Sequence, residues 1–395
     1  MVVCWFLGIG VLLPWNSIVT IGDYYYQLFP HYHPGRVLAL IPQPFSLGTS
    51  AILSYHVSKI NTRKRTLFGY VLFSFSIFGI LLIDLATSGK GGLPTYIAIC
   101  VLVASFGVES ALVEGGVLGE LSFMCPEFIQ SFIAGLAASG ALTSCLRLLT
   151  KALFDNTNHG LRKGVMLYMG ISTFVEFMCI FMYAYIFAKI PIVKHFRKKA
   201  ALDRSRALAA NVVVDVQINN EMLSFYYLQV DERQSNKELV LQNIDYTSGV
   251  FLIYALTFSI FPGFLYENTG THKLGSWYAI VLIAAYNVWD MIARFIPLVE
   301  RIKLESRRGL LIASLLRLLF VPSFYFTSKY QVDQGWMIML VSFLGLTNGY
   351  LTVCIFTVAP RGYMAAEQNA LGNLLVLFIL IGLFSGACLD LLWTL

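Results

Sequence analysis

The chain has 395 residues, of which 57% are hydrophobic, 14% aromatic and only 13% charged, and its mean hydropathy is +0.70. A soluble domain carries roughly 25% charged residues. This composition therefore excludes a water-soluble globular protein. The net charge of +6 is by itself a weak clue to partners, and its placement along the chain is more informative than its size. We expect no nucleic-acid partner.

Eleven apolar blocks, most of them close to the length of a membrane-spanning helix, follow one another along the chain. A helix needs about 20 apolar residues to cross a bilayer. In lipid every backbone amide needs a partner inside the protein, so these blocks are predicted to be helices. We predict an all-α, polytopic membrane protein with about eleven transmembrane helices. The blocks cover 2–21, 37–57, 67–87, 94–123, 127–150, 164–188, 247–265, 276–299, 309–327, 335–358 and 368–393.

Lysine and arginine are concentrated in alternate connections. Loops 58–66, 189–246, 300–308 and 359–367 hold 18 of the 28 basic residues. Such loops are retained in the cytoplasm. With eleven spans, this places the N-terminus inside and the C-terminus outside.

One long connection divides the predicted spans into six and five. We therefore expect an N-terminal six-helix bundle over 1–188, a cytoplasmic linker loop over 189–246 and a C-terminal five-helix bundle over 247–395. The linker opens with the basic run at 194–206. This run serves as a topology signal in a flexible linker, or it contacts anionic lipid or a regulatory partner. Two bundles around a central site are typical of alternating access.

Three polar residues share one face of the eighth predicted span. Asp290 and Arg294 are four residues apart, with the acid first, so they can pair. Asn287 lies one turn earlier, on nearly the same face. Intramembrane charges are costly and usually functional. The trio either binds a ligand rich in hydroxyl and ring-nitrogen groups, or it is an ion pair that only joins helices.

Three acids lie in the fourth predicted span. Glu109 and Glu120 share a face, and Glu114 points about 140° away from Glu109. Glu109 and Glu114 are candidates for proton coupling, or they stay protonated as hydrogen-bonding groups. Glu120 is expected to be solvated near the cytoplasmic end. Arg317, inside the ninth span, is expected to pair with an acid or with backbone carbonyls, or to gate substrate.

No catalytic or metal-binding pattern is found in the sequence. It contains no nucleophile elbow, no zinc-binding His-Glu motif and no phosphate-cradling loop. The seven cysteines lie in or beside apolar blocks without metal spacing, and the histidines lie at predicted helix ends or in loops. We therefore expect neither an enzyme nor a bound metal or cofactor.

A series of motifs resembles the equilibrative nucleoside transporter family. GIGVLLPWNSIVT (8–20) is similar to the signature of the family's first helix. Further matches follow in the family's order at 259–265, 286–294, 316–322, 346–353 and 366–376. Those at 22–30, 59–65 and 125–132 resemble the plant branch. The resemblance covers nearly the whole chain.

The resemblance implies a major-facilitator-like fold that carries purine and pyrimidine nucleosides, such as adenosine and uridine, through a central cavity. It implies that Trp15 lines this cavity, with Asn16 as the next residue of the same motif, and that Phe261 belongs to the Phe-Pro pair of the seventh helix. These three residues are predicted to bind substrate. It also implies that Asp290 and Arg294, beside Asn287, engage the ribose. The family usually has a Gln at the position of Glu114, where it contacts the base; a carboxylate only accepts hydrogen bonds unless protonated.

Transport is expected to be facilitated or coupled to protons, with the plasma membrane as the expected location and the vacuole or another endomembrane as alternatives. Nucleobases, cytokinin ribosides or another small polar solute are the alternative substrates. The expected partners are thus the nucleoside, the lipid bilayer and, where transport is coupled, protons.

Overall fold

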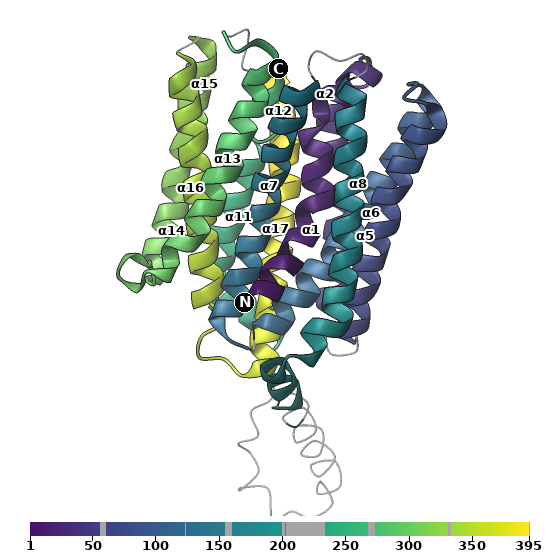
Figure 1. The fold of residues 1–395 in the computed structure, drawn as a ribbon. Coiled ribbons are helices and arrows are strands. Elements are labelled where there is room, and N and C mark those ends of the chain that lie inside the picture. The colour runs from purple at the N-terminus through teal and green to yellow at the C-terminus, as the bar shows by residue number, and fades with distance from the viewer. Residues whose placement is uncertain are drawn as a thin grey trace, which may run out of the picture.

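The computed structural model is a bundle of long helices that run side by side (Figure 1). The structure describes residues 1–55, 61–122, 124–154, 160–199, 202, 234–267, 273–330 and 333–394. No β-strand occurs in these ranges, which confirms the all-α prediction. Most of the predicted linker, 203–233, lies outside the described residues.

The first half of the bundle is built from helices that match the first six apolar blocks. They are α1 (Val2–Thr20), α2 (Gly22–Leu28), α3 (Pro34–Leu40), α4 (Pro42–Tyr55), α5 (Thr62–Thr87), α6 (Leu93–Leu121), α7 (Pro126–Phe154) and α8 (Gly160–Phe181), which continues as a π-helical stretch, Met182–Phe187.

The second half follows the long connection and begins with short α10. Its helices are α10 (Asn236–Gln242), α11 (Ile244–Phe258), α12 (Gly263–Glu267), α13 (Tyr278–Phe295), α14 (Arg307–Leu316), α15 (Phe320–Lys329), α16 (Gln334–Val358) and α17 (Ala365–Asp390). A 3-10 turn, Arg317–Leu319, joins α14 to α15 one turn before Pro322, which has no N–H to donate within the helix.

Ten helices in the described part of the chain are long and apolar enough to cross a membrane. The predicted span 37–57 instead consists of α3 and α4, which are separated at Ile41, just before Pro42. The two termini lie at opposite ends of the bundle, as an odd number of crossings requires (Figure 1). The count of eleven stays a prediction.

Helices from the two halves pack directly on each other. Helix α7 contacts α1 on one side and α13 on the other, while α17 contacts α4 and α6. Within the first half, glycine permits a close approach of α7 to α1: a Cβ on Gly135 would lie 2.0 Å from the carbonyl oxygen of Trp5. Large apolar side chains such as Phe75 and Leu319 are 69% and 65% exposed on the outside of the bundle, where lipid would cover them.

Candidate functional site

A central cavity lies where these helices meet. It is lined by α1, α4, α5, α6 and α7 from the first half of the chain and by α11, α13, α16 and α17 from the second. The atom-free space is about 1040 Å³, including the part open to solvent. Cavities between the helices of a bundle are common sites for small ligands.

The cavity brings together residues that are far apart in the sequence. All seven residues that the sequence predicts for substrate binding contribute to its wall; they are Trp15, Asn16, Glu114, Phe261, Asn287, Asp290 and Arg294. Glu109, the other predicted proton-coupling residue, is not among the lining residues. The structure thus separates Glu109 from the other predicted positions, and it places the polar trio of α13 at the cavity and not toward lipid.

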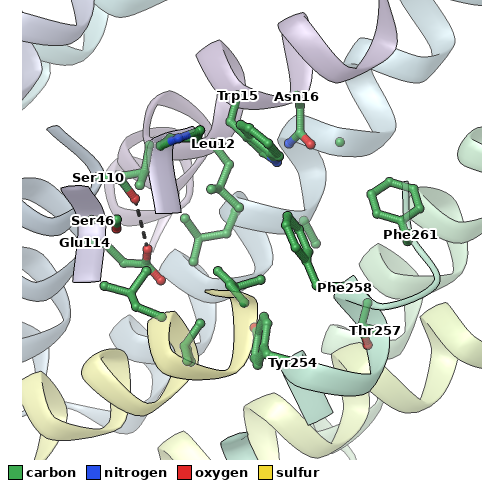
Figure 2. A pocket seen from close by; sticks show the side chains of 18 of the residues that line it. Leu12, Trp15, Asn16, Ser46, Ser110, Glu114, Tyr254, Thr257, Phe258 and Phe261 are labelled. Atoms are coloured by element: carbon green, nitrogen blue, oxygen red, sulfur yellow. Dashed lines mark hydrogen bonds between the residues drawn. The ribbon is translucent and has the colours of Figure 1, made fainter. Parts of the chain in front are cut away.

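Aromatic rings form one wall of the cavity. The ring centroids of Trp15 and Phe258 are 6.0 Å apart, and those of Phe261 and Tyr286 are stacked at 4.3 Å with an interplanar angle of 24°. In Figure 2, Trp15 and Phe258 point into the cavity, and Phe261 lies on the side opposite Glu114. Flat apolar surfaces of this kind suit a flat ring in the ligand.

The predicted pair on α13 is formed and almost completely buried. Arg294 Nη2 lies 2.9 Å and Nε 3.1 Å from Asp290 Oδ2. Arg294 Nη1 also donates to the carbonyl oxygen of Ile133 on α7 at 2.7 Å. The arginine therefore orients the carboxylate and joins the two halves of the bundle, so the two roles considered for this pair are compatible.

Asparagine amides extend the polar wall. Asn287 Nδ2 donates to Ser144 Oγ of α7 at 2.9 Å, and Asn16 Nδ2 donates to Ser139 Oγ of the same helix at 2.7 Å. A Cβ on Gly140 would lie 2.6 Å from Asn287 Oδ1, so the glycine makes room for this amide. Each amide keeps an unfilled hydrogen-bonding position for a ligand.

The two acids of α6 that are candidates for proton coupling have different surroundings. Glu114 lines the cavity, with Ser110 Oγ 3.5 Å from Oε2, and forms no ion pair with any residue the structure describes. Glu109 is fully buried inside the first half and accepts a hydrogen bond from Ser76 Oγ of α5 at 2.5 Å. Only Glu114 is placed to meet a ligand in the cavity.

Several lining residues were not predicted from the sequence. Asn348 of α16 donates to Asp290 Oδ1 at 2.8 Å, and Tyr254, Thr257 and Phe258 of α11 complete the second half of the wall. A buried asparagine in the middle of an apolar block was a usable signal for Asn348. Tyr254 and Thr257 carry no such signal, because both residue types are common in membrane helices. Within the described ranges, no group of three or more metal-ligating side chains is found.

Comparisons with known proteins agree with this architecture. The profile of the nucleoside transporter family matches residues 97–395. Equilibrative nucleotide transporter 3 of Arabidopsis thaliana is 59% identical over 100% of this chain and 94% of its own length, and transporter 5 of the same plant is 58% identical with the same coverage.

Solved structures support the fold. The proton:xylose symporter XylE, of the major facilitator superfamily, superposes with a TM-score of 0.65 at 12% identity over 99% of this chain and 86% of its own. A bacterial homologue of the iron transporter ferroportin, in an outward-facing state, gives 0.57 at 14% identity over 99% and 90%. The chain is therefore a multi-pass membrane transporter, not an enzyme, and it belongs to the plant branch of the equilibrative nucleoside transporter family.

Proposed function

We propose that this transporter carries purine and pyrimidine nucleosides, such as adenosine and uridine, by alternating access and without ATP. The observation that carries the proposal is the meeting of Asn287, Asp290 and Arg294 with aromatic rings in one cavity between the two halves. Hydroxyl groups of a ribose match the carboxylate and amides, and a base matches the rings. The name of the family gives nucleosides as the solute, whereas its Arabidopsis relatives are named transporters of nucleotides.

The proposed mechanism follows from the position of the cavity between 1–188 and 247–395. Rocking of one bundle against the other would expose the site to each side of the membrane in turn. Asp290 would accept hydrogen bonds from ribose hydroxyls, Arg294 would hold this carboxylate, and Trp15 would lie against the base. Segment 189–246 would link the bundles in the cytoplasm, and the plasma membrane is the proposed location.

A direct test is uptake of radiolabelled uridine and adenosine by cells that lack their own nucleoside uptake. We expect uptake above that of cells with an empty vector, and competition by ribonucleosides but not by the free bases. Competition by uracil and adenine as strong as that by their nucleosides would instead identify a nucleobase carrier. Competition by cytokinin ribosides would add these compounds to the substrates.

A pH experiment separates facilitated from proton-coupled transport. If protons enter with the substrate, uptake rises in acidic medium and falls with an uncoupler. Glu114 lines the cavity and Glu109 does not. We therefore expect Glu114→Gln to flatten the dependence of uptake on pH, and Glu109→Gln to leave this dependence unchanged. The reverse pattern would move the proton site into the first half, and a flat profile in the unaltered protein would indicate facilitated transport.

A further inference from the structure

Asp290 is the last member of a buried chain of hydrogen bonds that begins at Arg317. Arg317 Nη2 lies 2.8 Å from Thr257 Oγ1, and Thr257 Oγ1 lies 3.0 Å from Asn348 Oδ1. Asn348 Nδ2 then lies 2.8 Å from Asp290 Oδ1. The four side chains come from the α14–α15 turn, α11, α16 and α13, and none of the residues is more than 4% exposed.

The chemistry of these groups fixes the direction of every hydrogen bond in the chain. A guanidinium group can only donate and an ionised carboxylate can only accept. Asn348 must therefore turn its NH₂ to Asp290 and its oxygen to Thr257, whose hydroxyl then donates to it. The carbonyl oxygen of Ile253 accepts from Arg317 Nη1 at 3.0 Å and also lies 2.8 Å from Thr257 Oγ1, so the Thr257 proton is shared between this oxygen and Asn348 Oδ1.

Arg317 is buried without a carboxylate partner in the part of the chain that the structure describes. Among the described residues no acid forms an ion pair with it, and it also donates to the carbonyl oxygen of Leu344 at 3.3 Å. A buried cation is costly, and such residues in membrane helices usually serve function. The hydrogen bonds through Thr257 and Asn348 connect the positive charge of Arg317 to the carboxylate of Asp290 in the candidate site.

A close helix contact brings Asn348 to Asp290. A Cβ on Gly349 would lie 2.3 Å from the carbonyl oxygen of Asp290, so α16 and α13 approach to a distance that only glycine permits. With Asn348 on Oδ1 and Arg294 on Oδ2, both carboxylate oxygens are held, and without Asn348 only Oδ2 would be. The lone pairs that remain free therefore have fixed directions toward the cavity.

We propose that Asn348, held by Thr257 and Arg317, is a positioning residue that sets how Asp290 distinguishes the hydroxyl groups of the sugar. This proposal rests on the proposed function, because it needs Asp290 to bind the ribose. Asn348 acts through Asp290: a carboxylate held only at Oδ2 by Arg294 would bind ribose and deoxyribose with less difference between them.

The test compares KM for uridine, 2′-deoxyuridine and 3′-deoxyuridine in Asn348→Ala and Thr257→Val. We expect the preference for uridine over the deoxynucleosides to fall by about 5-fold or more in both variants, as loss of one hydrogen bond to a charged group implies. Thr257→Val removes the hydroxyl but keeps the shape of the side chain. Thermal shifts of the purified protein with the same three ligands provide a second measurement that does not need transport.

Thr247→Val is the matched control, because Thr247 is also buried in α11 and its hydroxyl bonds only to the carbonyl oxygens of Asn243 and Ile244. We expect this variant to keep the sugar preference of the unaltered protein. If Asn348→Ala and Thr257→Val change KM for all three nucleosides by one common factor, these hydrogen bonds only stabilise the fold and the proposal is wrong. If the unaltered protein takes up no nucleoside, the proposed function fails first.

Discussion

Uptake of uridine and adenosine should fall by about 100-fold or more in Asp290→Ala. The variant removes the proposed ribose acceptor and also leaves the buried Arg294 without its anion, and breaking a buried pair from one side costs about 3–5 kcal/mol. Asn348 Nδ2 loses its acceptor at the same time. Initial uptake rates, normalised to the amount of protein in the membrane, measure the effect.

A second variant separates the loss of binding from the loss of pairing. Asp290→Ala combined with Arg294→Ala removes both charges, so protein abundance and thermal stability should recover relative to Asp290→Ala alone, whereas uptake should not. Recovery of uptake in the double variant would show that Asp290 serves only to neutralise Arg294.

The control for Asp290→Ala is an acid that also pairs with arginine but lies away from the cavity. Asp245 at the start of α11 pairs with Arg307 at 2.7 Å, and both side chains are partly exposed. Exposed pairs contribute about 0–1 kcal/mol. Asp245→Ala should therefore change uptake by less than about 5-fold, and a loss as large as that of Asp290→Ala would remove the special role of the α13 pair.

Much of the fold could be predicted because a bilayer allows few solutions. Long apolar blocks must be helices, and the blocks at 67–87 and 335–358 correspond to α5 and α16. The interruptions were not predicted, although a proline stands beside each of them. Pro42 follows the break at Ile41 and Pro322 follows the turn Arg317–Leu319, and hydropathy alone does not register the missing N–H of a proline.

The candidate site was predictable in part for a similar reason. The spacing of Asp290 and Arg294 within one helix gives their pairing directly. Contacts between helices cannot be obtained from spacing, so Asn348 was missed. The same limit made the expectation of a solvated Glu120 wrong. Glu120 is buried, and its Oε1 lies 2.5 Å from Arg197 Nε. Arg197 belongs to a helical segment at 191–199, where a linker was expected.

Trp15→Ala should raise KM for nucleosides by about 5- to 150-fold, since stacking of an aromatic side chain on a base contributes about 1–3 kcal/mol. The effect should be larger for adenosine than for uridine, because the purine covers more of the ring. Trp15→Phe keeps a flat apolar surface beside Phe258 and should recover most of the affinity.

Trp289→Ala provides the comparison, because Trp289 belongs to the same helix as Asp290 but is 41% exposed and does not line the cavity. Its loss should leave KM within about 2-fold, as expected for a surface substitution away from any special feature. If Trp15→Ala lowered the maximal rate and left KM unchanged for both nucleosides, Trp15 would take part in the movement of α1 and not in holding the base. The aromatic wall would then belong to the rocking interface, and the base would have to be bound by Glu114 and the side chains near it.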